Sequence, residues 1–212
     1  MAATRRKWGY LGAVTGLLVL TDQLTKYWAV SSLRPKPGGK LTVFKGLLDL
    51  SYVQNTGAAW GFLGGAPAWF RRPFFLVVSL AAVAFIVWIY RKIERGQWLL
   101  ATALASVLGG AVGNFVDRAI HGYVIDFIDA HWFDGPHWPT FNVADIGISV
   151  GVVALFVEMF LGARRAREGE AEDGAATATP GNAAPMPSAP AVRGTPAGER
   201  AGAAAPRGSE SK

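Results

Sequence analysis

Residues 98–118 read WLLATALASVLGGAVGNFVDR. The run over 98–116 holds no charged residue, and its length is close to what an α-helix needs to cross the hydrocarbon core of a bilayer, about 30 Å. Three polar side chains follow at its end, Asn114, Asp117 and Arg118. The stretch therefore predicts a membrane helix that carries a polar group at one end.

Three other apolar runs of similar length cover residues 8–30, 73–90 and 143–161. The chain is 51% hydrophobic with a mean hydropathy of +0.25, which is too apolar for an ordinary soluble domain with so polar a C-terminal region. Tryptophans stand at or near the ends of three runs, as expected for anchors at the membrane–water interface: Trp8, Trp28, Trp88 and Trp98. We expect a mainly α membrane protein built on a four-helix transmembrane bundle.

Basic residues cluster at alternate ends of these runs, at positions 5–7, 91–95 and 164–167. Because cytoplasmic loops carry an excess of Lys and Arg, the clusters predict that both termini are cytoplasmic and that residues 31–72 and 117–142 lie outside. The first outer loop also holds six scattered basic residues, which weakens the signal. The formal net charge of +6 is explained in the same way, so we do not interpret it as nucleic-acid binding.

The outer loops contain short apolar segments of their own. Residues 41–44 and 48–54 read as two strands after a Pro- and Gly-rich turn, which predicts a small extracytoplasmic antiparallel sheet. Residues 124–133 are expected to form a surface helix in the membrane interface. From residue 168 the sequence is rich in Ala, Pro and Gly, so we divide the chain into a membrane-embedded domain, 1–167, and a disordered cytoplasmic tail, 168–212.

Charged residues inside the first apolar run need a separate explanation. Asp22 and Lys26 are one helical turn apart, which favours an intramembrane ion pair with a structural role. Lys26 could instead reach lipid phosphates or substrate. The N-terminus loosely fits a cleavable signal peptide, but Asp22 and Lys26 interrupt the region where such signals are bland, so an uncleaved helix is favoured.

The polar group after the third run can be interpreted in two ways. Asp117 next to Arg118 could be the partner of an arginine, which would keep its carboxyl ionised and make it a poor general acid. Asp117 is then a scaffold residue and Arg118 a donor to substrate carbonyls. The alternative is a polar cap at the end of a helix.

Two further aspartates suggest acid–base chemistry. Asp126 stands inside an apolar run, where desolvation raises the pKa of a carboxyl, whereas Asp145 stands at the head of the fourth run, where a helix N-terminus favours negative charge. Two carboxyls in such different surroundings can serve as one acid and one base around a water. Taken singly, each could also be structural, Asp145 as a helix cap and Asp126 as a salt-bridge partner.

Other chemistries have weaker support. The chain has no cysteine, which removes disulfides, thiolate nucleophiles and cysteine-rich metal sites. Ser149 lies in a Gly-x-Ser-x-Gly pattern, but inside an expected helix and with no histidine near it in sequence. His121, His131 and His137 share one outer loop, yet their spacing matches no standard zinc ligand set. We therefore expect no metal and no cofactor.

Five ordered blocks carry a resemblance to a known family: DQLTK (22–26), NTGAAW (55–60), GGAVGNFVDR (109–118), VIDF (124–127) and FNVAD (141–145). Together they resemble the lipoprotein signal peptidases (signal peptidase II), bacterial intramembrane aspartyl proteases, over about residues 8–165. The resemblance implies four transmembrane helices, an outer β-cradle and an interfacial helix that closes over the site. It implies a catalytic dyad of Asp126 and Asp145, with Asp117 as a contender for the first position.

The resemblance also implies the remaining site residues and the partners. Asn55, Asn114, Arg118 and Asn142 would bind the substrate backbone and hold the dyad. The expected reaction is cleavage on the amino side of the lipidated cysteine in a diacylglyceryl-modified prolipoprotein, by dyad-activated water. The expected setting is a monomer in the bacterial inner membrane, surrounded by phospholipid, with its site at the outer face and with globomycin-type cyclic peptides as inhibitors. Two alternatives stay open, a small channel or transporter and a non-catalytic lipid-binding factor.

Overall fold

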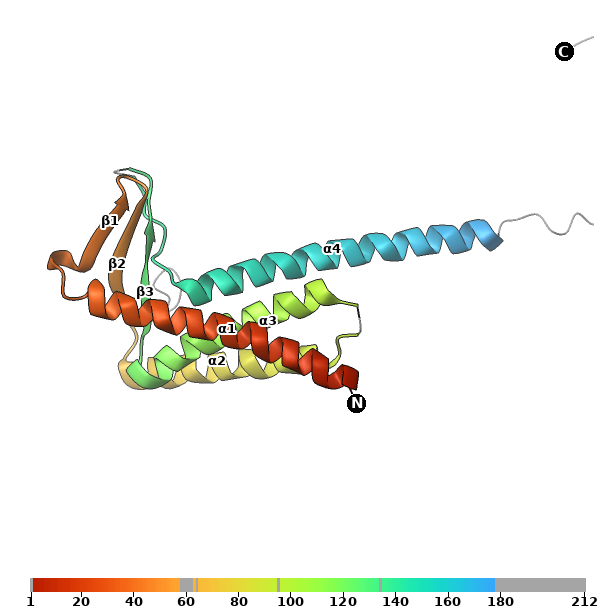
Figure 1. Ribbon diagram of the computed structural model, residues 1–212, viewed down its shortest axis with the longest axis horizontal. Helices are drawn as coiled ribbons and strands as arrows, with labels where there is room; N and C mark the ends of the chain where they lie inside the picture. The colour runs from red at the N-terminus through yellow and green to blue at the C-terminus, as the bar shows by residue number, and fades with distance from the viewer. Residues whose placement is uncertain (1, 58–62, 64, 95, 134, 178–212) are drawn as a thin grey trace, which may run out of the picture. The chain divides into compact units, whose positions relative to one another are not determined.

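The computed structural model describes residues 2–177 apart from 58–62, 64, 95 and 134. The chain divides into two units, Met1–Glu170 and Ala171–Lys212, and all the side-chain contacts discussed below belong to the first. The elements follow the order α1 (Ala2–Ser32), η1 (Pro37–Gly39), β1 (Lys40–Phe44), β2 (Leu48–Asn55), α2 (Ala68–Arg91), α3 (Trp98–His121), β3 (Val124–Ala130) and α4 (Val143–Thr177) (Figure 1).

Three of the described helices are long and apolar enough to cross a membrane: α2, α3 and residues Val143–Glu168 of α4. They correspond to three of the four predicted runs. The fourth run lies in α1, which is a long helix but does not reach the same hydropathy over the described residues. Asp22 and Lys26 contribute to that difference. α4 continues to Thr177, so residues 168–177, predicted to be disordered, are helical.

The helices pack through small residues on α3. A Cβ on Gly109 would lie 2.9 Å from the side chain of Leu18 in α1. A Cβ on Gly110 would collide with the backbone carbonyl of Ala144 in α4. These glycines let α1 and α4 approach α3 closely, as small residues commonly do between membrane helices.

A buried apolar cluster joins α1, α2 and α3 at the end of the helices away from the sheet. Tyr90 of α2 is fully buried there, and its hydroxyl donates to the backbone carbonyl of Lys7 at 2.9 Å. The other members of the cluster are Leu11, Ile86, Ile93, Ala101, Leu104, Ala105 and Leu108. This core fixes the three helices at one end and leaves the opposite end for the polar residues.

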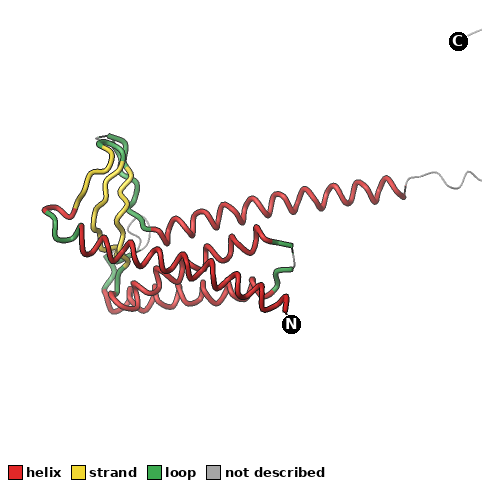
Figure 2. Tube along the Cα trace, in the orientation of Figure 1, coloured by secondary structure: helices red, strands yellow, loops and turns green. Residues whose placement is uncertain are grey.

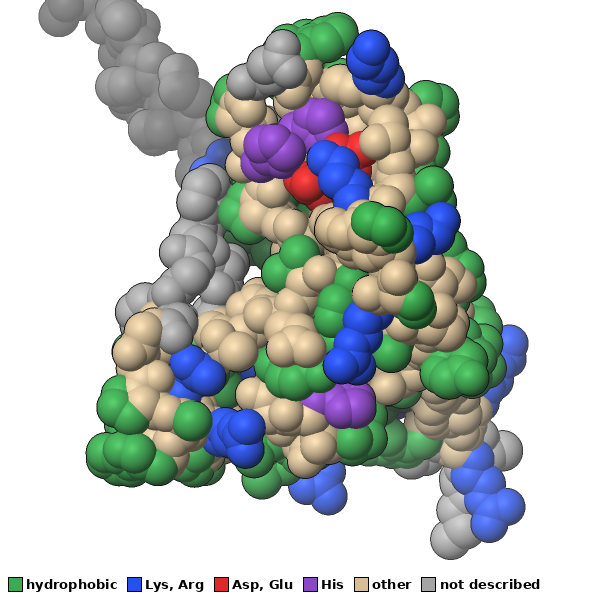
Figure 3. All heavy atoms as spheres, turned by 90° about the vertical axis from the view of Figure 1, so that its left-hand side faces the viewer, with side chains coloured by type: hydrophobic (Ala, Val, Ile, Leu, Met, Phe, Trp, Pro, Cys, Tyr) green, Lys and Arg blue, Asp and Glu red, His purple; other side chains and the backbone are tan. Residues whose placement is uncertain are grey.

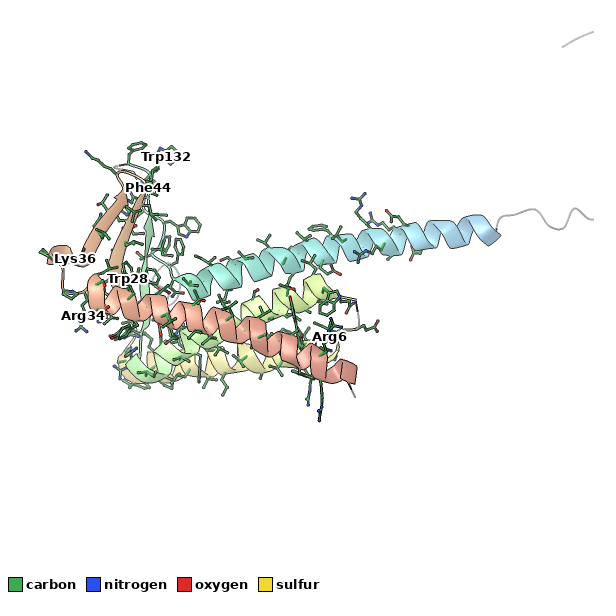
Figure 4. All side chains as sticks on the ribbon, viewed as in Figure 1. Arg6, Trp28, Arg34, Lys36, Phe44 and Trp132 are labelled. Carbon is green, nitrogen blue, oxygen red and sulfur yellow. The ribbon has the colours of Figure 1, made fainter. Side chains whose placement is uncertain are left out.

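The strands form one antiparallel sheet in the order β1-β2-β3, at the end of the helices where α1 finishes (Figures 1 and 2). The small antiparallel sheet predicted from the first outer loop is thus confirmed, with a third strand added. Trp28 lies where α1 meets the sheet, and its ring contacts the ring of Phe127 in β3 at a centroid distance of 6.5 Å. Phe44 and Trp132 lie at the far end of the sheet and are largely exposed (Figure 4).

The third strand corrects a prediction. Residues 124–133 were expected to form a surface helix, but Val124–Ala130 is strand β3, and Ala130 and Val124 pair with Leu48 and Asn55 of β2. The segment is rich in Val, Ile and Phe, which favour a pleated and half-buried strand. Its other edge bonds to Phe141, whose carbonyl accepts from the backbone N–H groups of Phe127 and Ile128. The strand therefore places the side chain of Asp126 in the interior of the protein.

Candidate active site

Asp126 is buried in the middle of β3, with only 1% of its surface exposed. Its Oδ1 accepts a hydrogen bond from Nδ2 of Asn142 at 2.7 Å, and its Oδ2 accepts one from Nδ2 of Asn55 at 2.9 Å. Asn55 is the last residue of β2, so the pairing of the two strands brings this donor to the carboxyl. Both oxygens of Asp126 are thus held by neutral amides.

Asp145 lies in the first turn of α4 and forms a reciprocal cap with Asn142. The backbone N–H of Asp145 donates to Oδ1 of Asn142 at 3.0 Å, and the backbone N–H of Asn142 donates to Oδ2 of Asp145 at 3.2 Å. This arrangement follows the logic of a capping box, in which two residues satisfy each other's orphan donors at a helix start. Nδ2 of Asn114 donates to Oδ1 of Asp145 at 2.8 Å. Asp145 is thus fixed from α3 and from its own helix.

Asn142 is therefore bonded to both predicted catalytic aspartates. It is fully buried, and its side-chain amide also contacts Oδ1 of Asn114 at 3.2 Å and the carbonyl of Ile125 at 3.3 Å. The structure brings together Asp126, Asp145, Asn55, Asn114 and Asn142, which come from four different segments of the sequence. The two carboxyls share the same polar environment.

The electrostatics distinguish Asp126 from an ordinary carboxyl. Burial raises the pKa of Asp126 to about 7, and the nearby charge of Asp145 adds to this rise. The hydrogen bonds from Asn55 and Asn142 act in the opposite direction but are weaker than desolvation. Asp126 is therefore suited to hold a proton near neutral pH.

Lys26 is the centre of a second, fully buried polar cluster. Its Nζ lies 2.8 Å from Oδ2 of Asp22, 2.9 Å from Oδ2 of Asp117 and 3.0 Å from Oδ1 of Asn114. The Asp22–Lys26 pair predicted from their spacing is present. Lys26 is only 1% exposed, so it points into the bundle and does not reach toward lipid. Its contact with Asn114 joins this cluster to the two-aspartate site.

Asp22 and Asp117 also accept hydrogen bonds from the backbone. Oδ1 of Asp22 accepts from the N–H of Ala144 at 2.9 Å, next to Asp145. Oδ2 of Asp117 accepts from the N–H of Ile125 at 3.0 Å, next to Asp126. Each of the two acids thus holds the residue that precedes a predicted catalytic aspartate.

The predicted arginine partner of Asp117 is wrong. The cation beside Asp117 is Lys26 of α1, and Oδ1 of Asp117 accepts from Nε2 of Gln23 at 3.0 Å. Arg118 points elsewhere, and its guanidinium lies 5.2 Å from the ring centroid of Phe75. Among the described residues its hydrogen bonds are long, to the carbonyls of Gly57, at 3.4 Å, and Asn114, at 3.5 Å. The prediction failed because Asp117 and Arg118 are adjacent in the sequence, and successive residues of a helix face different directions.

A pocket opens beside the two-aspartate site, on the side of Arg118. Asn55, which donates to Asp126, is part of its wall. The other lining residues are Thr56, Arg71, Arg72, Phe75, Arg118, Gly122 and Tyr123. Arg71 and Arg72 were counted only as scattered basic residues in the sequence, because nothing in their spacing relates them to Arg118.

Comparison with known proteins shows to which family the chain belongs. The sequence profile described as "Signal peptidase (SPase) II" matches residues 14–161. The chain belongs to the signal peptidase II family. A protein named lipoprotein signal peptidase from Anaeromyxobacter sp. (strain Fw109-5) is 40% identical over 202 residues, which cover 82% of this chain and 96% of that protein. One of the same name from Syntrophotalea carbinolica is 44% identical over 144 residues, which cover 68% of this chain and 86% of the relative.

Solved structures agree with the signal peptidase II assignment. One, reported as "Bacterial membrane enzyme structure by the in meso method at 2.3 A resolution", aligns with a TM-score of 0.64 and 29% identity, covering 73% of this chain and 90% of its own. A second bacterial membrane enzyme, reported at 1.9 A, aligns with a TM-score of 0.61 and 30% identity over 71% of this chain and 92% of its own. All five sequence blocks fall within the residues that match the family profile.

The structure also shows where the residues of the two alternative sites lie, the serine site at Ser149 and the histidine metal site. Ser149 lies inside α4, where no strand–helix elbow exists. His131 and His137 lie beyond the far end of β3, bonded to Asp49 at 2.7 Å and to Asp129 at 2.9 Å respectively. Within the described part of the chain, no group of three His, Cys, Asp or Glu side chains is arranged to hold a metal.

Proposed function

We propose that this chain is an aspartic endopeptidase that removes the signal peptides of diacylglyceryl-modified prolipoproteins. The observation that carries the proposal is the pair Asp126 and Asp145, bonded to one buried asparagine in a chain of the signal peptidase II family. The cut would fall on the amino side of the lipidated cysteine. Arrival of the substrate by lateral diffusion in the membrane fits a protein whose described residues include three apolar, membrane-length helices.

In this mechanism Asp126 begins protonated and Asp145 ionised. The raised pKa of Asp126 supports the first assignment, and the position of Asp145 at a helix N-terminus supports the second. Asp145 takes a proton from a water whose oxygen attacks the scissile carbonyl carbon, while Asp126 gives its proton to the carbonyl oxygen. The intermediate then returns that proton to Asp126 and loses the amine, which takes the proton held by Asp145. No acyl-enzyme forms, so no nucleophilic side chain is needed.

The surrounding polar residues have two roles in the proposal. Asn55, Asn114 and Asn142 hold the dyad, with their amide nitrogens already donating to its carboxylates. Arg118 supplies donors to substrate carbonyls, because its present contacts are long and easily exchanged. The cluster of Asp22, Lys26 and Asp117 is structural. It holds the backbone of β3 and of α4 in position on the two sides of the reacting water.

The membrane setting follows from the same assignment. α1 would be the fourth crossing, both termini would lie in the cytoplasm, and the sheet and site would face outward in the bacterial inner membrane. The acyl chains of the substrate would supply much of its affinity, at about 0.8 kcal/mol per buried methylene. Globomycin-type cyclic peptides would compete for the site, and the chain would act as a monomer in phospholipid.

The test is cleavage of a purified lipidated precursor, read as a gel shift. Asp126→Asn and Asp145→Asn should each leave the precursor uncut. Asp129→Asn is the matched control, because Asp129 lies on the same strand but bonds to His137 and not to the dyad. Addition of a chelator should leave the rate unchanged. Normal cleavage by Asp126→Asn or Asp145→Asn would reject this dyad and point to Asp117 as a member. Loss of activity with the chelator would reject the mechanism and favour a metal site.

A further inference from the structure

The turn between β1 and β2 and the segment after β3 meet at one end of the sheet, where the backbone N–H of Phe133 donates to the carbonyl of Gly46. We call this end, residues 44–47 and 131–133, the sheet tip. It presents Phe44, Trp132 and Phe133, which are 62%, 68% and 60% exposed. Large apolar residues gathered at one exposed place usually mark a contact surface.

The backbone of the sheet tip keeps these rings outward. Phe133 has a φ of 48°, which is uncommon for a bulky residue. Its ring lies over Gly46, where a Cβ would be only 2.6 Å from Cδ1 of Phe133. The ring of Trp132 meets that of Phe133 edge-on at a centroid distance of 5.9 Å. The fold thus fixes two large aromatic residues in a strained turn without burying them, which favours a contact with a surface outside the chain.

A polar network behind the sheet tip holds it in place. Oδ2 of Asp49 lies 2.7 Å from Nε2 of His131 and 2.6 Å from Nζ of Lys40. Nδ1 of His137 lies 2.9 Å from Oδ1 of Asp129, and the rings of the two histidines stack with their centroids 4.7 Å apart. Figure 3 shows acidic side chains in one place on this face, next to histidine and basic side chains. Both of these described acids are therefore paired with basic groups and do not repel an anionic surface from the sheet tip.

The sheet tip lies at the level of the helix ends. Figure 4 shows Phe44 and Trp132 at a similar position along the helix axes to Trp28, in the last turns of α1, whereas Lys36 lies farther out. Trp28 is partly exposed, and Trp69 at the start of α2 is largely exposed. Tryptophans at the ends of membrane helices are typical of the membrane–water interface. The sheet tip therefore continues the level that these two tryptophans define.

The direction of the strands places the sheet tip beside the bundle. The strands run across the ends of the helices and do not continue along them, so the sheet tip extends sideways beyond the start of α4 (Figures 1 and 2). Because α2, α3 and most of α4 are long and apolar enough to cross a membrane, this sideways direction lies in the membrane plane. Ile146 and Val150 in the first turns of α4 are also exposed, as expected for residues that face acyl chains. The surface next to the sheet tip is therefore lipid.

We propose that the sheet tip anchors the sheet to the bilayer, with Phe44, Trp132 and Phe133 inserted among the phospholipid headgroups. Aromatic side chains are enriched at this depth because they combine a large apolar area with tolerance of a wet surrounding. Lys45, next to Phe44, is exposed and can extend its ammonium to the phosphates. The contact would hold the sheet, and with it Asp126 on β3, at a constant height above the acyl chains. The proposal rests on the membrane placement given above but not on the peptide-cleaving chemistry.

The experiment measures the depth of a spin label from its accessibility to oxygen, which enters lipid, and to a water-soluble nickel complex. The chain has no cysteine, so one introduced cysteine is the single labelling site. Trp132→Cys places the label on the sheet tip. Lys36→Cys is the control, because Lys36 is exposed in the turn before β1 and lies farther out (Figure 4). The full chain is studied in phospholipid nanodiscs that hold one copy each, and Phe44→Cys reports on the same tip if the Trp132 variant does not fold.

The label at position 132 should lie on the order of 5 Å below the phosphates, as interfacial apolar groups do, and the label at position 36 should lie in water. The label at position 44 should agree with the label at position 132. Equal access of the nickel complex to positions 132 and 36 would overturn the proposal. Protection of position 132 that appears only in nanodiscs with two copies would assign the sheet tip to a contact between copies and reject the lipid contact.

Asp126→Asn separates this proposal from the proposed function. That variant should lose cleavage but leave the depth of the label at position 132 unchanged. A protein that cuts precursor normally while its sheet tip lies in water would refute the anchor alone. A protein whose sheet tip lies in lipid but which leaves precursor uncut would refute the peptidase assignment alone.

Discussion

Nδ2 of Asn142 lies 2.7 Å from Oδ1 of Asp126, while the backbone of the same asparagine starts the helix that carries Asp145. One residue therefore determines both the orientation of the first carboxyl and the position of the second. A strand and a helix meet at this point, so small changes at Asn142 alter the spacing between the two acids.

Replacement of Asn142 should separate its two roles. Asn142→Ser keeps a helix-capping oxygen for Asp145 but is too short to reach Asp126, so it should lower the cleavage rate with little loss of stability. Asn142→Ala removes both functions and should cost about 1 kcal/mol more in unfolding free energy. Cleavage rates and thermal melts of the two variants provide the check. Equal rates for Asn142→Ser and the wild type would contradict the role given to this residue.

Removal of the charge on Lys26 should destabilise the fold. Lys26→Met leaves Asp22 and Asp117 buried without their cation, which commonly costs about 3–5 kcal/mol. Adding Asp22→Asn to this variant should recover part of the loss, because one uncompensated carboxylate disappears. Thermal unfolding in detergent measures both effects. A Lys26→Met protein as stable as the wild type would show that this cluster does not hold the helices together.

The cleavage rate should fall as the pH rises through about 7. The assignment requires Asp126 to be protonated, and burial raises the pKa of Asp126 to about 7. Above that pH both carboxyls carry charge and the general acid is lost. The rate of single-turnover cleavage between pH 5 and pH 9 tests this. A rate that keeps rising to pH 9 would require a different proton donor.

The same raised pKa predicts a pH-dependent stability. In the unfolded chain Asp126 loses its proton near pH 3.8, whereas in the folded protein it keeps the proton to about pH 7. The unfolding free energy of the wild type should therefore fall between these pH values, by on the order of 4 kcal/mol, and then level off. Asp126→Asn should lack this decline. The melting temperature of the variant minus that of the wild type should therefore increase from pH 5 to pH 8. Asp129→Asn, as control, should follow the wild type.

Close contact between α3 and α4 should be needed for activity. Gly110→Ala places a Cβ against the carbonyl of Ala144, which must shift, and Asp145 follows in sequence. We expect a stability loss of about 1–3 kcal/mol and reduced cleavage as Asp145 moves from Asn114. Gly12→Ala is the control, since nothing lies within 4 Å of its Cβ. Similar melting temperatures and rates for the two variants would contradict this packing account.

The sequence anticipates features that depend on local spacing. The Asp22–Lys26 contact follows from one helical turn, and the apolar runs correspond to helices because length and composition determine them. Contacts between elements could not be anticipated in the same way. Lys26 of α1 reaches Asp117 of α3, and Arg72 of α2 lies against Gly122 at the end of α3. The strand at Asp126 was missed because its pairing partner, β2, lies between α1 and α2, far away in the sequence.

The central claim is that Asp126, and not Asp117, forms the dyad with Asp145. The direct measurement is the single-turnover cleavage rate of a lipidated precursor by Asp126→Asn and by Asp117→Asn, each normalised to the folded and precursor-binding fraction. We expect Asp126→Asn to bind precursor but to cut it at least about 10²-fold more slowly, whereas the folded fraction of Asp117→Asn should still cut. The opposite result, with cleavage retained by Asp126→Asn and lost in folded Asp117→Asn, would contradict the account.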